Sequence, residues 1–252
     1  MSKLRATAVG FSLLALSGLG YIQGPKLFDR AFAAAGQQQF VDPTKLPSRI
    51  ARLPVILEEP AGRPKAIVLF LSGDGGWRGI DESIASALAR QGYLVAGLDS
   101  VIYFDKRHSP DGVARDSARI LSELRRRYGV HDYVLAGYSF GADVLPFVER
   151  RLPEFQKRDL RLTVLIGASP TADFWLGYGK LFKSFGVAEA PTRPEIAALG
   201  PVRLACFYGA EEDGSLCPSL KGPNISSIAL PGSHHFNGDY DLLARRITAL
   251  LQ

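Results

Sequence analysis

Hydrophobic residues along the chain follow two patterns. Short continuous apolar runs are typical of strands buried on both faces of a sheet. They cover Ala66–Leu71, Tyr93–Leu98, Tyr133–Ala136, Leu162–Ile166, Val202–Tyr208 and Ile225–Leu230. Apolar residues with helical spacing form three further sets, two between these runs and one after the last. The sets are Ile80, Ile84, Ala87 and Leu88; Ala114, Ala118, Leu121, Leu124 and Tyr128; and Tyr240, Leu243, Ile247 and Leu250. The alternation predicts an α/β fold with helices on both faces of a mostly parallel sheet.

The first residues have the composition of an export signal. Lys3 and Arg5 precede an apolar stretch over residues 6–22, and the small residues around 31–35 offer Ala-x-Ala-like cleavage sites. We therefore expect a signal peptide at 1–35, a polar linker at 36–52 and a single domain at 53–252. The apolar stretch is near the minimum spanning length of about 17 residues, so an uncleaved membrane anchor is the alternative.

Charge gives no support for a nucleic-acid partner. The formal net charge is +5, but residues 1–35 carry +3 of it and leave +2 for the rest of the chain. The basic run Arg125–Arg127 ends a predicted helix, where cations complement the helix dipole. Contact of this run with anionic lipid headgroups is the alternative interpretation.

A serine motif follows the third apolar run. Gly-Tyr-Ser-Phe-Gly at 137–141 comes after the predicted strand Tyr133–Ala136 and before a helix-compatible stretch. This is the context of a nucleophile elbow, in which glycines allow the strand and the helix to approach each other. Ser139 is the candidate nucleophile, and the Phe140 N–H is a candidate oxyanion donor.

A candidate general base lies in the loop after Ile225–Leu230. His234 and His235 are adjacent there. They lie downstream of Ser139, as the chain order serine, acid, histidine of a nucleophile-elbow site requires. A neutral imidazole is needed to accept the serine proton. We assign His235, which directly precedes an aromatic residue, and keep His234 as the alternative.

A candidate acid follows the run Val202–Tyr208. An orienting carboxylate holds the catalytic imidazole in its productive tautomer. We choose Asp213, which is followed by a glycine, while Glu211 and Glu212 are rivals. Cys206 and Cys217 flank this loop, and in an oxidising compartment we expect them to form a disulfide.

A glycine-rich loop follows the run Ala66–Leu71. Its sequence is Ser-Gly-Asp-Gly-Gly-Trp at 72–77, and it lacks the Gly-Lys-Ser/Thr ending of a phosphate-binding loop. We expect the Asp74 N–H, or that of Gly75, to be the second oxyanion donor.

Residues 169–200 interrupt the alternation and are rich in aromatic side chains. These are Phe174, Trp175, Tyr178, Phe182 and Phe185. The segment is interpreted as a lid over the site, or alternatively as aromatics packed on the sheet edge. We expect Trp77, Tyr138 and Trp175 to contact the substrate.

Several motifs together resemble the bacterial VirJ/AcvB virulence-protein family. They are the segments 72–77, 137–143, 208–213, 217–218 and 232–236, and the resemblance extends from about Leu53 to Gln252. It implies an α/β-hydrolase fold, a periplasmic location and hydrolysis of aminoacylated phospholipids such as lysyl-phosphatidylglycerol. It also implies an association with secretion of virulence factors. The resemblance is to the short members of the family, so we expect the chain to lack the long additional N-terminal region of the larger members.

These features predict a periplasmic serine ester hydrolase. We expect no cofactor, and no metal because the paired histidines have no third or fourth ligand close by in the sequence. The expected partners are a phospholipid or small-molecule substrate, a membrane surface and components of a secretion system. The alternative is a non-catalytic chaperone or docking factor that keeps a hydrolase fold.

Overall fold

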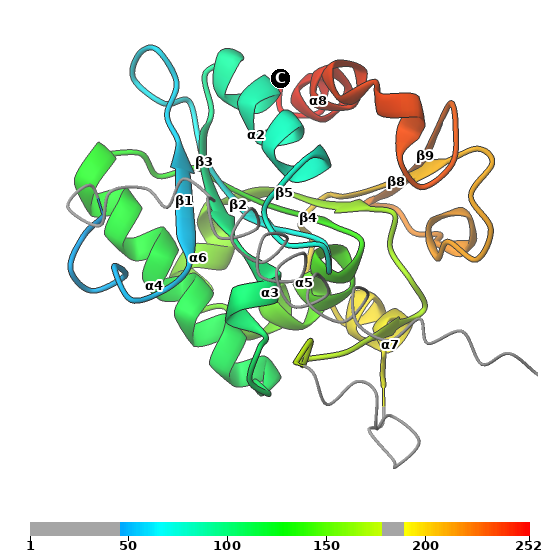
Figure 1. Cartoon of the computed structure of the whole chain (residues 1–252), viewed down its shortest axis with the longest axis horizontal. Coiled ribbons are helices and arrows are strands. Elements are labelled where there is room, and N and C mark those ends of the chain that lie inside the picture. Colours follow the sequence, from blue (N-terminus) through cyan, green and yellow to red (C-terminus); the bar gives the residue numbers. More distant parts are fainter. Residues whose placement is uncertain (1–45, 178–188) are drawn as a thin grey trace, which may run out of the picture. The chain divides into compact units, whose positions relative to one another are not determined.

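The computed structural model describes residues 46–177 and 189–252 (Figure 1). One sheet has the strand order β1-β3-β2-β4-β5-β8-β9. Every neighbouring pair is parallel except β1 with β3. The strands are β1 (Val55–Glu58), β2 (Ile67–Leu71), β3 (Leu94–Leu98), β4 (Tyr133–Tyr138), β5 (Leu160–Ile166), β8 (Leu204–Gly209) and β9 (Ile225–Leu230). The predicted α/β class is confirmed. The predicted signal peptide and anchor lie outside the described residues.

Two helical layers bury the two faces of this sheet. On one face α2 (Ile80–Arg90) and α8 (Tyr240–Ala249) lie together, and on the other α4 (Pro110–Tyr128) packs beside α5 (Phe140–Arg151) (Figure 1). Each pair forms a separate hydrophobic core with one face of the sheet. The central strands are therefore buried on both sides, which is why they read as continuous apolar runs.

Shorter elements connect these layers. They are α3 (Ser100–Tyr103), α6 (Glu154–Asp159), β6 (Thr171–Ala172), β7 (Ala190–Pro191), α7 (Thr192–Ala197), η3 (Cys217–Ser219) and η4 (Phe236–Gly238). None of the helices within 46–177 and 189–252 has the length and apolarity needed to cross a membrane.

The domain starts earlier than the sequence predicted. Leu46 and Ile50 belong to the core on the α4 side of the sheet, and Ile50 is completely buried. Their spacing of four residues places both on one side of a turn. The prediction of a linker is therefore wrong for residues 46–52, while residues 36–45 lie outside the described chain.

The arginines at the end of α4 have partners inside the fold. Arg125 pairs with Asp159, and Arg126 pairs with the buried Glu123. The guanidinium of Arg127 lies 5.4 Å from the centre of the Tyr128 ring. These contacts favour the structural interpretation of the basic run.

Candidate active site

Ser139 occupies a strained turn between β4 and α5. Its φ is +52° and its ψ is −119°, a backbone conformation that non-glycine residues rarely adopt. A Cβ on Gly137 would lie 2.6 Å from the carbonyl carbon of Gly141, and a Cβ on Gly141 would lie 2.1 Å from the carbonyl oxygen of Leu71. The two glycines are thus required for the close approach of strand and helix, as the elbow motif predicted.

The glycine-rich loop after β2 lies directly beside this serine. A Cβ on Gly73 would be 3.6 Å from the Cβ of Ser139. The loop turns back on itself where the Gly76 N–H donates to the Gly73 carbonyl at 3.1 Å. The structure therefore brings together the two segments that carry Asp74 and Phe140. Because the first N–H groups of a helix have no intrahelical acceptor, that of Phe140 is available to a ligand.

A buried polar network holds the glycine-rich loop. Asp81 of α2 accepts the Gly73 N–H at 3.1 Å. The Ser72 hydroxyl accepts the Ser100 N–H at 2.9 Å, and the Ser100 hydroxyl donates to the Ser72 carbonyl at 2.7 Å. Burial raises the pKa of Asp81 to about 7. The sequence did not reveal these roles, because an acid in the first turn of a helix is usually exposed.

The imidazole beside the site belongs to His234, and its carboxylate partner is Glu212. Nδ1 of His234 lies 2.6 Å from Oε1 of Glu212. The other carboxylate oxygen of Glu212 accepts the Gly209 N–H at 3.0 Å. The side chain of Glu212 is only 8% exposed and that of His234 is 33% exposed. The carboxylate is thus held from two sides in a largely water-excluded position.

The predicted pairing of His235 with Asp213 is wrong. His235 is exposed, and its Nδ1 lies 3.0 Å from the Tyr138 hydroxyl. Asp213 is also exposed, at a loop tip where the next residue, Gly214, has φ +78°. The turn between Gly209 and Glu212 directs the glutamate back towards the sheet and leaves the aspartate in solvent.

His234 lies at the carboxyl edge of the sheet, beside the end of β5. A Cβ on Gly167, the residue after β5, would lie 2.5 Å from Cε1 of His234. The Ser139 N–H donates to the carbonyl of Ile166 at 2.8 Å, so the serine and this imidazole adjoin the same strand end. Ser139, Glu212 and His234 follow β4, β8 and β9, whose carboxyl ends share one edge of the sheet. Ligands of open α/β sheets bind at such edges.

The three aromatic residues expected to contact substrate have different positions. Trp77 is buried against Phe70, with ring centres 5.7 Å apart, and covers Gly97, where a Cβ would be 2.1 Å from the indole. The prediction for Trp77 is therefore wrong. Tyr138 is buried beside the histidine loop and orients that loop through its hydroxyl.

Trp175 is half-buried and bonded to the backbone. Its Nε1–H donates to the Asp105 carbonyl at 3.1 Å. Phe174 packs on Phe147, with ring centres 5.2 Å apart, so this start of the aromatic segment packs on the fold. Tyr178, Phe182 and Phe185 lie outside the described residues, and the lid stays a prediction.

A second buried acid adjoins the site on α5. Asp143 accepts the Ser169 N–H at 2.6 Å, which joins α5 to the loop after β5. Burial raises its pKa to about 7, although the Ser169 hydrogen bond and the nearby His234 act in the opposite direction. Asp74 is a further charged neighbour that raises this pKa. Because its pKa lies near neutrality, this second carboxyl group is only partly ionised at pH 7.

A disulfide closes the loop that carries Glu212. Cys206 on β8 is bonded to Cys217 on η3, and their Cα atoms are 5.3 Å apart. The predicted bridge is confirmed. It joins both ends of the acid loop to the core, since both cysteines are completely buried.

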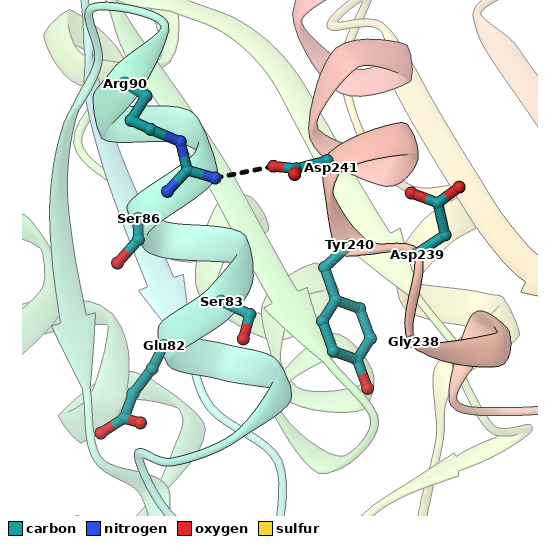
Figure 2. A pocket seen from close by; sticks show the side chains of 8 residues that line it. All are labelled: Glu82, Ser83, Ser86, Arg90, Gly238, Asp239, Tyr240 and Asp241. Carbon is teal, nitrogen blue, oxygen red and sulfur yellow. Dashed lines mark hydrogen bonds and ion pairs between the residues drawn. The ribbon is translucent and has the colours of Figure 1, made fainter.

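A separate pocket of about 390 Å³ lies between α2 and α8 (Figure 2). Its lining residues are Glu82, Ser83, Ser86, Arg90, Gly238, Asp239, Tyr240 and Asp241. An ion pair of 2.7 Å between Arg90 and Asp241 connects the two helices at this pocket (Figure 2). Since the lining includes neither Ser139 nor the His234–Glu212 pair, the pocket is distinct from the candidate site.

Comparisons with known proteins agree with this architecture. The family described as bacterial virulence protein (VirJ) matches residues 65–252. Among solved structures, Est1E from Butyrivibrio proteoclasticus with bound ferulic acid is 10% identical, with a TM-score of 0.55 over 78% of this chain and 93% of that chain. TT1662 from Thermus thermophilus is 21% identical, with a TM-score of 0.54 over 79% and 92%. A thioesterase domain from the curacin biosynthetic pathway is 13% identical, with a TM-score of 0.53 over 79% and 94%. These likenesses show the α/β-hydrolase fold. No curated protein sequence matches the chain.

Proposed function

Because the chain belongs to the bacterial virulence protein (VirJ) family and has an α/β-hydrolase fold, we propose that it is a serine-dependent ester hydrolase. One observation carries this proposal. A buried glutamate holds Nδ1 of His234 at the sheet edge where Ser139 occupies a strained turn. A histidine oriented in this way by a carboxylate has its second nitrogen free to act as a base.

The proposed reaction proceeds through an acyl-enzyme. The Ser139 hydroxyl attacks the ester carbonyl while Nε2 of His234 accepts its proton. The carboxylate of Glu212 stabilises the imidazolium that forms. The N–H groups of Asp74 and Phe140 are the proposed donors to the oxyanion.

His234 then transfers protons in both half-reactions, first acylation of Ser139 and then deacylation. It donates the proton to the leaving alcohol, and Ser139 is left acylated. A water molecule next gives a proton to His234 and attacks the acyl carbon. Return of that proton to Ser139 releases the acid and restores the enzyme.

We propose that the ester is an aminoacylated phospholipid, such as lysyl-phosphatidylglycerol, in the periplasm. The family resemblance of the motifs supports this substrate. The exposed carboxylate of Asp74, in the glycine-rich loop beside Ser139, also favours a cationic acyl group. An ammonium group beside this carboxylate would be favoured over a neutral acyl chain.

Mutation of the nucleophile tests the activity. We expect a fluorophosphonate probe to label the protein and to leave Ser139→Ala unlabelled, while the exposed Ser226→Ala control is labelled normally. Loss of a triad member usually lowers the rate by several orders of magnitude. Full ester hydrolysis by Ser139→Ala would overturn the proposal.

Two purified lipids test the proposed substrate separately from the hydrolase activity. One is lysyl-phosphatidylglycerol, and the other is phosphatidylglycerol that carries a neutral acyl ester. Only the charged ester should be hydrolysed rapidly.

A further inference from the structure

Two adjacent aliphatic side chains on α3 are exposed. Within residues 46–177 and 189–252, the exposed large hydrophobic side chains are Val101 at 41%, Ile102 at 40% and Phe155 at 46%. Scattered exposed apolar residues are normal on a protein surface, but an adjacent pair provides a continuous apolar contact area. The α3 pair is therefore a candidate for a docking surface.

This pair lies at the edge of the candidate active site. A Cβ on Gly76 of the glycine-rich loop would be 3.4 Å from Cβ of Val101. Phe104, which follows α3 directly, packs on Phe140, the residue after the nucleophile, with ring centres 4.9 Å apart. The exposed pair is thus attached to both segments that carry the proposed oxyanion donors.

Basic and aromatic side chains continue this surface. Lys106 and Arg107 are exposed directly after α3, together with the acidic Asp105. The guanidinium of Arg107 lies 5.4 Å from the centre of the Trp175 ring. The indole N–H of Trp175 is bonded to the Asp105 carbonyl, which fixes the ring beside Arg107. Tryptophan and basic side chains next to exposed aliphatics are the combination found at membrane–water interfaces.

We propose that Val101, Ile102, Lys106, Arg107 and Trp175 form a rim that docks the protein on an anionic lipid bilayer. The aliphatic pair enters the headgroup region, and the cations contact lipid phosphates. This contact places the carboxyl edge of the sheet, which carries Ser139, towards the membrane, where a phospholipid ester would be found. The orientation of the substrate rests on the proposed function, whereas binding to the bilayer does not.

Vesicle co-sedimentation of the full chain tests the rim. We expect binding to phosphatidylglycerol-containing vesicles and much weaker binding to phosphatidylcholine vesicles. A basic residue near an anionic surface contributes about a fivefold factor to binding, so Lys106→Gln/Arg107→Gln should weaken it at least tenfold at low salt. Val101→Ser/Ile102→Ser should also weaken binding, and its effect should persist when salt screens the charges.

A matched pair on α6 provides the control. Phe155 and Arg158 are also exposed, but α6 directly precedes β5 and so lies at the edge of the sheet opposite Ser139. Phe155→Ser/Arg158→Gln should bind vesicles like the unmodified protein. Any contribution of residues 1–45 is common to all these proteins and cancels in the comparison.

Activity on two substrates separates this inference from the proposed hydrolase function. The rim variants should hydrolyse a soluble chromogenic ester normally but should act more slowly on lipid esters in vesicles. Unchanged vesicle binding by both rim variants, equal loss in the α6 control, or equal binding to phosphatidylcholine would overturn the docking surface. Failure of the hydrolase assignment would appear instead as activity that does not depend on Ser139, with vesicle binding unaffected.

Discussion

Replacement of Glu212 by glutamine tests which acid orients the histidine. In the structure both carboxylate oxygens of Glu212 are acceptors, one 2.6 Å from Nδ1 of His234 and the other 3.0 Å from the Gly209 N–H. A glutamine side chain has nearly the same shape but only one acceptor oxygen. If that oxygen bonds to the Gly209 N–H, the amide NH₂ faces His234 and forces its proton onto Nε2. The imidazole then cannot accept the serine proton.

The expected loss in kcat for Glu212→Gln is about 10³- to 10⁴-fold, as for the equivalent change in known catalytic triads. This corresponds to about 4–5.5 kcal/mol of transition-state stabilisation, at 1.36 kcal/mol for each factor of ten. Part of the loss is geometric, because the charged hydrogen bond to the imidazole disappears. Part is electrostatic, because the imidazolium formed in the transition state loses its counter-ion.

Steady-state hydrolysis of a soluble chromogenic ester measures this effect. Asp213→Asn is the matched control, since it removes the exposed carboxylate next in sequence and should leave kcat unchanged. His234→Ala should be at least as inactive as Glu212→Gln, because it removes the base itself, whereas His235→Ala should keep most of the activity. A large loss in Asp213→Asn together with near-normal Glu212→Gln would refute the assignment made from the structure.

Three further predictions concern stability. Cys206→Ala/Cys217→Ala should lower the free energy of unfolding by about 3 kcal/mol in denaturant titration, since the cysteines are 11 residues apart; an unchanged midpoint would contradict this. Gly141→Ala places a Cβ 2.1 Å from the Leu71 carbonyl oxygen and should prevent native folding, as judged by circular dichroism and soluble yield. Burial raises the pKa of Glu149 from 4.5 to about 7. The folded state therefore binds this proton more tightly than the unfolded state, and stability should fall by up to about 3 kcal/mol as pH rises through this interval. Glu149→Gln should remove that part of the pH dependence, and a pH profile identical to that of the unmodified protein would argue against it.

The sequence alone determined the architecture and the position of the strained serine turn. Continuous apolar runs indicated buried parallel strands because a sheet covered on both faces leaves no polar side to alternate with. Ser139 was identifiable because Gly137 and Gly141 are required by backbone contacts within one short turn, so the motif and its geometry are inseparable. The Cys206–Cys217 bridge was predictable because these are the only cysteines in the chain.

Three features outside the central strands were harder to predict: the first strand, the start of the domain and the position of Trp77. β1 has only four residues, Val-Ile-Leu-Glu, and is mostly half-buried, so its apolar run is too short to identify a strand. Leu46 and Ile50 looked like part of a polar segment because their burial depends on α4, which lies far away in the sequence. The place of Trp77 in the glycine-rich loop predicts a contact with substrate, but its ring fills the space above Gly97, and only the folded sheet creates that space.

Tertiary structure decided which acid pairs with which histidine. Residues 211–213 are all acidic and both candidate histidines are adjacent, so local sequence cannot say which side chain points inward. The Gly209 turn directs Glu212 towards the sheet, and the space beside Gly167 accommodates His234, while Tyr138 holds His235 elsewhere. These contacts join β4, β5, β8 and β9, which are distant in sequence. Long-range packing of this kind sets the direction of a loop side chain. Neighbouring acids, and likewise neighbouring histidines, have equivalent chemistry, so the sequence alone does not distinguish them.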